Sequence, residues 1–370
     1  SRINRLVGVL IILQTARTSH QKSQLMTPVT RRRWPCKQHC STPEPIIVQV
    51  RAINTDIVVV GAGIAGLSAA LGLASAGLKV THLRQQAAPE VPPDSARPFD
   101  RRVYAISPGS RGLLENLGVW RLLPTARVAP VYDMRVYPQA DPNARELHLS
   151  AYEAGCEALA WIIESGALIA ALEQALSFSR LNTVVGSLAT YEPEATPERG
   201  ELTLDNGQLI RARLVVGADG AGSPVRGQAG IAQSVKPYQQ KALVAPLALE
   251  RPHRDGAWQW FGRHGVLALL PMPMHEALDF TATFPDLPRD SGGMRASLVW
   301  SAPIEQAEQM LADGPEALSQ ALTDLAGHAF GRIRVLEAAA GFELRLCSAS
   351  SMIAPRTVLV GDAAHVIHPL

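Results

Sequence analysis

Short apolar segments rich in β-branched residues are followed by glycine turns along the chain. The run Asp56–Val60 (DIVVV) predicts a buried parallel strand, and a second apolar run lies around Val80–Leu83. Between them, the small residues of Leu67–Ala76 predict a helix that ends at Gly77. A strand, a glycine turn, a helix and a second strand together form the dinucleotide-binding unit.

Later segments have the alternating pattern of antiparallel strands. Residues Glu201–Val216 predict a hairpin around an Asp205-Asn206-Gly207 turn. Residues 236–345 alternate apolar and polar segments with Pro and Gly breaks, which predicts an antiparallel sheet with a helix near Ile304–Leu311. Three more short strands are expected at Tyr132–Tyr137, Glu146–Leu149 and Thr357–Val360.

The first glycine turn, GAGIAG, has the spacing of a dinucleotide-binding fingerprint. Gly61 permits a tight turn, Gly63 leaves room for a pyrophosphate, and Gly66 lets the helix pack close to the sheet. Ile64 and Ala65 open the helix, whose free N–H groups favour a phosphate. The alternative interpretation is an ordinary strand-to-helix turn.

One position departs from this fingerprint. An acid normally ends the second strand and accepts hydrogen bonds from a ribose hydroxyl, but here that place holds Arg84. A guanidinium has only donors, so Arg84 can bind a ribose oxygen without replacing the carboxylate. An arginine there also suits a 2′-phosphate, so the binding of the adenosine end stays open.

Two more glycine-rich motifs follow predicted strands. GADGAGSPVR contains Asp219, Gly220, Ser223 and Arg226, and it continues the second arm of the hairpin. GDAAHVIHPL follows the strand at Thr357–Val360. The alternative for the first of these is an ordinary glycine cluster, and for His365 a structural histidine at the start of a helix.

The three motifs together resemble those of the single-component aromatic hydroxylases, and more narrowly those of the ubiquinone-biosynthesis hydroxylases. Further similar stretches are Asp100–Trp120, Gly265–Met272, Ala296–Ser301 and Ala158–Leu176, the last resembling a helix of the FAD domain. The resemblance implies FAD as cofactor and NAD(P)H and O2 as co-substrates. It also implies a flavin C4a-hydroperoxide that hydroxylates an aromatic ring, here of a polyprenyl phenol.

The resemblance also assigns cofactor-binding residues. It places Asp219 near the pyrophosphate and the nicotinamide, Asp362 at the ribityl chain, His365 near the phosphates, and Arg102 close to the flavin. With the first motif and Arg84, the complete expected set is Gly61, Gly63, Ile64, Ala65, Gly66, Arg84, Arg102, Asp219, Gly220, Arg226, Gly361, Asp362, Ala363, His365 and Pro369. A catalytic base is not identified; Asp279, Glu343 and Glu164 are unsupported options.

The expected fold class is α/β, α+β overall, with a Rossmann-like FAD-binding domain interrupted by an antiparallel-sheet substrate domain. The FAD-binding domain is expected to be discontinuous, with the substrate domain inserted twice. The predicted ranges are 55–127, 151–235 and 346–370 for the FAD-binding domain, 128–150 and 236–345 for the substrate domain, and 1–54 for an extension that is disordered or non-native.

Composition excludes several classes of function. The 370 residues carry a net charge of +2, which gives no reason to expect nucleic acid as a partner. Four cysteines form no disulfide framework, which favours a reducing compartment. Cys36 and Cys40 flank His39, but no second ligand pair has zinc spacing, so no metal site is expected. We therefore expect a cytoplasmic protein. The greasy substrate that the resemblance implies would bring it to the inner membrane or to a ubiquinone-biosynthesis complex.

Both ends differ from the family pattern. Ser1–Pro43 contains only basic charge, which suits a signal segment, a mitochondrial presequence or, as we favour, upstream sequence before the functional start. The chain stops at Leu370, where the family continues into a glycine loop and helices, so we expect a C-terminally truncated hydroxylase with weak FAD retention. The alternatives to the prenyl-phenol hydroxylase are a hydroxylase of a soluble aromatic compound and a catalytically incomplete fragment.

Overall fold

The structure, a computed structural model, describes residues 52–88, 100–138, 146–274, 280–286 and 294–368. The chain divides into two units, Ser1–Val48 and Gln49–Leu370, and only the second contains described residues. The predictions for the basic segment, for Cys36, His39 and Cys40, and for Asp279 and Pro369 therefore lie outside the described residues.

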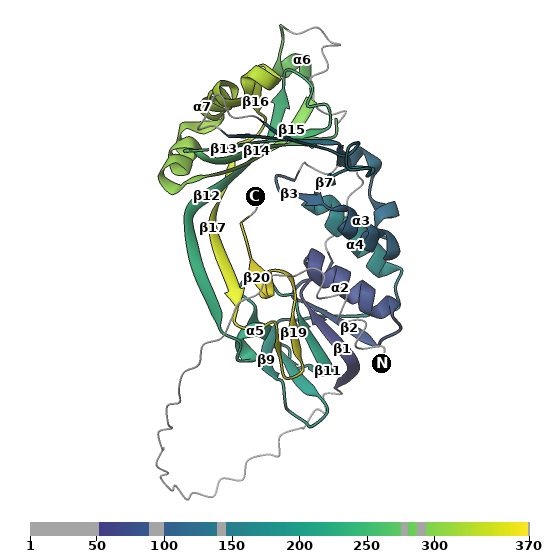
Figure 1. The fold of residues 1–370 in the computed structure, drawn as a ribbon. Coiled ribbons are helices and arrows are strands. Elements are labelled where there is room, and N and C mark those ends of the chain that lie inside the picture. Colours follow the sequence, from purple (N-terminus) through teal and green to yellow (C-terminus); the bar gives the residue numbers. More distant parts are fainter. Residues whose placement is uncertain (1–51, 89–99, 139–145, 275–279, 287–293, 369–370) are drawn as a thin grey trace, which may run out of the picture. The chain divides into compact units, whose positions relative to one another are not determined.

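The first sheet contains the predicted dinucleotide-binding unit. β1 (Ile53–Val60) and β2 (Val80–Arg84) pair in parallel, with α2 (Ile64–Ser75) between them (Figure 1). The helix begins three residues earlier than predicted, directly after Gly63. The parallel strands lie in the order β19-β11-β1-β2-β8, where β8 is Asn182–Val185, β11 is Leu209–Gly217 and β19 is Thr357–Leu359.

The predicted hairpin extends this sheet. β10 (Gly200–Leu204) pairs with β11 in antiparallel register, so that Glu201 lies opposite Arg211. Gly207 in the turn has a φ of 80°, which glycine adopts without strain. Two further short strands complete this sheet, β9 (Leu188–Glu192) beside β10 and β18 (Ile353–Ala354) beside β19.

A small three-stranded sheet accompanies the helices beside α2. It has the order β3-β7-β4, formed by Val103–Ile106, Ala160–Glu164 and Val128–Val131. The segment Ala158–Leu176, predicted to be one helix, is instead the strand β7 followed by α4 (Ser165–Ser177). Its Trp-Ile-Ile run pairs with both neighbours, and packing in a sheet overrides helix propensity there. The remaining elements are α3 (Pro108–Asn116), η2 (Trp120–Leu122) and η3 (Thr125–Arg127).

A large, mainly antiparallel sheet has the order β20-β17-β12-β15-β14-β13-β5-β6, with β16 beside β12. Among the described strands, β5 and β13 form the one parallel pair of this sheet. Its strands are β5 (Asp133–Pro138), β6 (Leu147–Ser150), β12 (Gln233–Leu249), β13 (Gly256–Gly262), β14 (Gly265–Met272), β15 (Met294–Pro303), β16 (Ile333–Val335), β17 (Ala340–Ala349) and β20 (His365–Val366). The short helices α5 (Pro224–Gln228), α6 (Phe280–Thr283) and η4 (Gly361–Ala363) complete the described chain.

Two helical segments, which together form α7 (Ile304–Phe330), pack on one face of the large sheet. The backbone of Gly314 is not helical, with a φ of 85° and a ψ of −177°, and Pro315 follows it, so the first segment ends there. The helix predicted near Ile304–Leu311 lies in this first segment, and the second segment was not predicted. Beneath α7 lies an apolar cluster that includes Leu298, Trp300 and Trp260. Trp258 packs against the same cluster, so both tryptophans of β13 serve packing.

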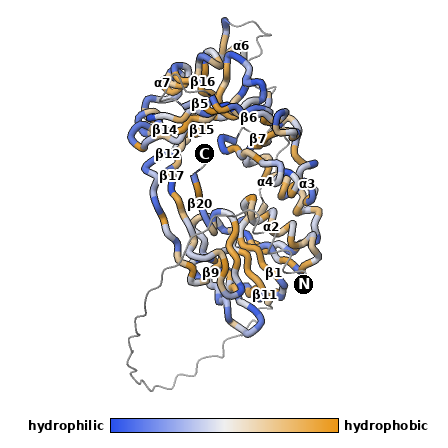
Figure 2. The backbone as a smooth tube through the Cα atoms, viewed as in Figure 1, coloured by the Kyte–Doolittle hydropathy of each residue, from blue (hydrophilic) through white to orange (hydrophobic). Residues whose placement is uncertain are grey.

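Two long strands connect the sheets. β12 and β17 pair from Gln233–Ala349 to Val244–Ala340, and they continue across the predicted domain boundaries at 235/236 and 345/346 (Figure 1). Around β1 and β11 the strands are mostly hydrophobic (Figure 2), because a parallel sheet is buried on both faces. Within the described residues no helix is long and apolar enough to cross a bilayer.

Candidate active site

The three glycine-rich motifs meet at the carboxyl ends of three neighbouring strands, β1, β11 and β19. A Cβ atom added at Gly61 would lie 2.1 Å from the carbonyl oxygen of Ala218, in the second motif. One added at Gly361 would lie 2.8 Å from the Cβ of Ala65, so the third motif contacts the first. Motifs far apart in the sequence therefore form one edge of the sheet.

The glycines of the first motif serve two different purposes. Gly61 has a φ of 123°, and a Cβ atom at Gly66 would lie 2.1 Å from the carbonyl oxygen of Gly61. Both positions therefore require glycine for packing. Gly63 has an ordinary φ of −80°, and nothing lies within 4 Å of a Cβ atom placed there. The space beside Gly63 is open.

The N-terminus of α2 opens into this space. Gly63 is the N-cap residue, and neither a side-chain cap nor an acidic residue occupies the first turn formed by Ile64 and Ala65. The first N–H groups of a helix and the positive end of its dipole attract an anion. The open, uncapped helix start therefore fits the pyrophosphate of FAD.

Asp219 is held firmly within its own turn. Ser223 Oγ donates a hydrogen bond to Oδ1 at 2.5 Å, and the main-chain N–H of Val225 donates to Oδ2 at 3.0 Å. Burial raises the pKa of Asp219 above its usual range, and these hydrogen bonds oppose that rise. Gly220 follows with a φ of 86°. The carboxylate stabilises the turn, and its predicted contact with cofactor or nicotinamide stays a prediction.

Arg226 connects the second motif to the third. Its side chain is buried, with Nη1 donating to the carbonyl oxygen of Ala363 at 2.9 Å. Nη2 donates to the carbonyl oxygen of Ala221 at 2.8 Å and to Gln233 Oε1 at 3.0 Å. Arg226 lies inside α5, whose N-cap is Ser223. These contacts are all to protein groups. Arg226 would therefore influence the cofactor indirectly, by fixing the position of Ala363.

The third motif turns into a strand. Asp362 is exposed in η4, as an acceptor for a ligand must be, and Ala363 is buried beneath it. His365 begins β20 opposite Ser348, so the alternative of a histidine at the start of a helix is wrong. The main-chain N–H of Ala349 donates to the carbonyl oxygen of Ala364 at 2.9 Å, which draws this segment onto β17.

The main chain of Arg102 is fixed on both sides. Its N–H donates to Asp100 Oδ1 at 2.9 Å, and its carbonyl oxygen accepts from the N–H of Ser165 at 2.9 Å. Asp100 Oδ2 also accepts from the N–H of Gly166 at 2.9 Å at the start of α4, a role that the sequence analysis did not identify. The exposed guanidinium carbon of Arg102 lies 5.9 Å from the centre of the Phe342 ring.

Arg84 does not project freely from the end of β2. It is buried and ion-paired with Glu173 of α4, with 2.8 Å between Nη1 and Oε1. Glu173 was not predicted as its partner from the sequence. The available signal was one acid inside the apolar run LIAALEQAL.

His82 forms a hydrogen bond with the first glycine turn. It is fully buried in β2, and its Nε2 lies 2.9 Å from the carbonyl oxygen of Gly61. Because a carbonyl only accepts, Nε2 carries the proton in this hydrogen bond. Burial lowers the pKa of His82 below its usual range, so the neutral ring is favoured.

One face of the large sheet is only partly covered, and we call it the open face. Alternation along the strands places Leu267 and Trp300 on the other face, beneath α7. Phe261 and Phe342, at the two ends of one row on the open face, are 43% and 45% exposed. This row across the paired strands is formed by Phe342, Ala242, Ser301, Val266 and Phe261.

The open face begins beside Arg102, which lies over Phe342. His368 reaches the same face, because its Nε2 lies 3.2 Å from Oε1 of Gln240, two residues before Ala242 on β12. The apolar run of β14 contributes to this face with every second residue only, because side chains alternate along a strand. An apolar surface thus lies next to the arginine that was expected at the flavin.

Two of the three options for a catalytic base, Glu164 and Glu343, do not face the open face. Glu164 is buried in an ion pair with Arg127, at 2.6 Å between Nη1 and Oε2. Glu343 follows Phe342 on β17, so alternation turns it away from the open face. Neither position supports a role as base.

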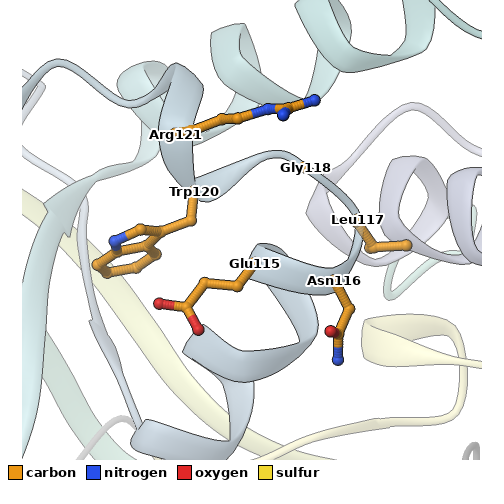
Figure 3. A pocket seen from close by; sticks show the side chains of 6 residues that line it. All are labelled: Glu115, Asn116, Leu117, Gly118, Trp120 and Arg121. Carbon is orange, nitrogen blue, oxygen red and sulfur yellow. The ribbon is translucent and has the colours of Figure 1, made fainter.

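Two hollows on the surface lie away from the motifs. One of about 360 Å³ is lined by Glu115–Gly118, Trp120 and Arg121 at the end of α3 (Figure 3). The other, of about 620 Å³, lies at the amino ends of β1, β2 and β8. Ligands of such sheets bind at the carboxyl ends of the strands, so we place the site at the motifs and not in these hollows.

The sequence model of the family described as FAD binding domain matches residues 54–370. The chain is similar to the 3-demethoxyubiquinol 3-hydroxylase of Escherichia coli (strain K12), with 33% identity over 323 residues, covering 85% of this chain and 74% of that protein. It is also similar to the ubiquinone hydroxylase UbiL of Rhodospirillum rubrum, with 31% identity over 322 residues, 85% of this chain and 67% of that protein.

Solved structures share the fold at lower identity. PqsL of P. aeruginosa in complex with 2-aminobenzoylacetate has a TM-score of 0.67 and 20% identity, covering 85% of this chain and 80% of that chain. The p-nitrophenol 4-monooxygenase PnpA of Pseudomonas putida DLL-E4 has a TM-score of 0.62 and 17% identity, covering 86% and 75%. At this identity the likeness establishes the arrangement of sheets and helices.

Proposed function

We propose that this chain, which belongs to the FAD binding domain family and is an FAD-dependent monooxygenase, hydroxylates the aromatic ring of a prenylated phenol on the route to ubiquinone. The observation that carries the proposal is the meeting of the three motifs beside an open, uncapped helix start. The names of the relatives support the choice of a ubiquinone precursor.

The bound flavin supplies the redox chemistry that joins NAD(P)H, O2 and an electron-rich ring. The residues of this chain hold and orient it. The N-terminus of α2 at Gly63 would hold the pyrophosphate, and exposed Asp362 would accept hydrogen bonds from the ribityl hydroxyls. Arg226 fixes the third motif against the second through Ala363. Because each of these groups is held by the fold, the cofactor is positioned with little reorganisation.

The open face supports an apolar substrate. Phe261, Val266, Ala242 and Phe342 belong to an apolar row whose Phe342 end lies beside Arg102, while Ala242 and Ser301 within the row are buried. An apolar wall with few polar groups is typical of sites that bind greasy aromatic molecules. In this proposal the row receives the prenyl chain, and Arg102 lies where the ring and the flavin meet.

The proposal extends to location. Such a substrate dissolves in a membrane, so the enzyme would work at the cytoplasmic face of the inner membrane, alone or within a biosynthetic complex. Exposed apolar side chains on and beside β6 support this, including Leu147 at 56%, Leu149 at 43% and Tyr152 at 93% exposure. Vesicle flotation tests it: the protein should float with lipid, and a Leu147→Ser/Leu149→Ser variant should not. Equal flotation of both proteins would remove β6 from the proposal.

The activity test uses the purified chain with FAD, NADPH, isotopically labelled O2 and a prenylated phenol. We expect NADPH oxidation that depends on the phenol and a product that carries one labelled oxygen atom. A short-chain phenol serves as the comparison substrate. A product from the short-chain phenol alone would favour a hydroxylase of soluble aromatics. NADPH oxidation without any labelled product would contradict the proposed reaction.

A further inference from the structure

A strained bulge interrupts the pairing of the two long strands that connect the sheets. Pro237 and Gln240 of β12 are three positions apart, yet they pair with consecutive residues of β17. The two residues between them, Tyr238 and Gln239, therefore have no pairing partner among the described residues of β17. Gln239 has a φ of 57°, a left-handed conformation that residues other than glycine seldom adopt. Such a conformation persists only where its surroundings require it, and it is enriched at functional sites.

The two residues that flank Gln239 contact the same side chain, that of His368. Oε1 of Gln240 lies 3.2 Å from Nε2 of His368, which donates because an amide oxygen only accepts. The ring of Tyr238 meets the His368 ring edge to face, with 5.2 Å between the ring centroids and 86° between the planes. Because Tyr238 stands outside the ladder of strand pairs, the bulge decides where its ring points.

His368 ends the described segment 361–368, which begins with the third glycine-rich motif. After Asp362 in η4, His365 and Val366 form β20, which pairs with β17 on the side away from β12. The sheet order is β20-β17-β12, so the side chain of His368 reaches across β17 to contact Gln240. The segment is thus attached at two places, to β17 through β20 and to the bulge of β12 through His368.

The second attachment lies between the third motif and the apolar row of the open face. Gln240 pairs with a residue of β17 next to Arg345, and the following pair on the open face is Ala242 with Phe342. Two residues along a strand correspond to roughly 7 Å. Phe342 is the ring that lies beside the guanidinium of Arg102. The contacts of His368 therefore lie close to the place where the flavin was expected to meet the substrate.

We propose that Tyr238 and Gln240 are positioning residues, which the bulge of β12 presents to His368 and which hold the segment 361–368 across the open face. The inference rests on the proposed FAD site, because exposed Asp362 in this segment is the expected acceptor for the ribityl chain. Tyr238 is 37% exposed, so the attachment lies at the surface of the site and not in the core. Its role is to keep the cofactor-binding segment in one position beside the substrate.

Hydrogen exchange of the segment 361–368, followed by mass spectrometry without cofactor, tests the attachment. Tyr238→Leu/Gln240→Ala removes one hydrogen bond and one ring contact, so exchange of this segment should become roughly tenfold faster. Exchange of β1 should stay as in the parent chain, because its core is untouched. Unchanged exchange of the segment would overturn the proposal. An equal acceleration in β1 would also overturn it, because the two residues would then stabilise the whole fold.

Variants of Gln239 test the bulge while both contacting side chains are kept. Gln239→Val places a β-branched residue in the left-handed conformation, which it resists, so exchange of the segment should rise as in the double variant. Gln239→Gly adopts this conformation freely and should keep the slow exchange. Arg254→Val is the matched control, because Arg254 has a φ of 53° in the turn before β13. Parent-like exchange in Gln239→Val, or equal exchange in Gln239→Val and Gln239→Gly, would show that the bulge does not present the two residues.

The rate of FAD release from the reconstituted chain, followed by flavin fluorescence after dilution, tests the consequence for the cofactor. Tyr238→Leu/Gln240→Ala and Gln239→Val should release FAD roughly tenfold faster than the parent chain, because the segment that holds the ribityl chain is loosened. Gln239→Gly and Arg254→Val should release it at the parent rate. Parent-like release from a variant with a loosened segment would overturn the positioning role. A chain that binds no FAD would contradict the proposed function, whereas the exchange measurement tests the attachment independently.

Discussion

Two buried Arg–Glu pairs in this protein have the same chemistry and different surroundings. Glu164 faces Arg127 at 2.6 Å and Arg295 at 3.9 Å, and its Oε2 also accepts from the N–H of Asp100 at 3.4 Å. Glu173 faces Arg84, whose Nη1 lies 2.8 Å from Oε1 and 2.9 Å from Oε2. The first carboxylate is enclosed by two arginines and a main-chain donor, whereas the second is held by a single arginine in the described part of the chain. The comparison indicates that the first pair holds together a larger cluster of buried charge than the second.

Breaking the enclosed pair should give the largest effect on stability. Arg127→Met leaves Glu164 buried without its nearest cation, and we expect the free energy of unfolding to fall by about 3–5 kcal/mol. Burial already lowers the pKa of Arg295 to about 10, which reflects how little solvent reaches this cluster. Urea denaturation measures the loss. Arg211→Met, in a surface pair, should cost only about 0–1 kcal/mol, and equal losses for the two variants would contradict the comparison.

The glycines of the first motif offer a second contrast between folding and binding. Gly61→Ala forces a Cβ atom against the carbonyl oxygen of Ala218, so we expect about 1–3 kcal/mol of destabilisation together with loss of FAD affinity. Gly63→Ala meets no atom within 4 Å, so its stability should change by less than about 1 kcal/mol. Its methyl group nevertheless occupies the space expected for the pyrophosphate, and FAD should bind about tenfold more weakly. Unchanged FAD binding in Gly63→Ala would place the pyrophosphate elsewhere.

The open face can be tested by the length of the substrate. Phe261→Ser removes an apolar ring from the end of the row, and KM for a prenylated phenol should rise about tenfold. KM for a short-chain phenol should stay the same, because that substrate does not reach Phe261. Phe178→Ser changes an exposed ring at the end of α4 and provides the control. Equal effects on both substrates would indicate that Phe261 serves the fold.

The smallest effect is the expected dependence of stability on pH. Burial lowers the pKa of His82, and also that of His253, so the unfolded chain binds more protons below its own histidine pKa of about 6.5. The stability is therefore complete above that pH and declines as the pH falls below it. His82→Gln retains a donor for the carbonyl oxygen of Gly61. It should flatten the decline in the free energy of unfolding, measured by chemical denaturation between about pH 7 and about pH 5. The same slope in both proteins would show that His82 does not titrate in this way.

The motif strands could be predicted from the sequence because each is a short β-branched run that ends in a glycine turn. The hairpin at Gly207 was predictable because its turn residues are typical of a hairpin turn. The second helical segment of α7 was not predicted, because Gly314 and Pro315 end the first segment and only packing on the sheet defines the apolar side of the second. The strand β7 was also missed, since its apolar run suits a helix until its partners β3 and β4 are known.

Residues of the candidate site could be picked out from the sequence where they follow strands, and their contacts within the protein were missed where the partners lie far apart in the sequence. Arg84 was recognised as a departure, but its neighbour Glu173 comes 89 positions later on another element. Asp100 and His82 support Arg102 and Gly61 through contacts that no local pattern contains. The roles of the predicted cofactor-binding residues remain predictions, with Arg226 and Asp219 now seen to hold the motifs themselves together.

The most direct test of the central claim is the visible spectrum of the purified chain with FAD, recorded before and after NADPH is added without oxygen. The account predicts a flavin band close to one FAD per chain that bleaches on addition of NADPH. When oxygen and a prenylated phenol are then admitted, the band should return together with a hydroxylated product. A chain that remains colourless after reconstitution with FAD would contradict the account.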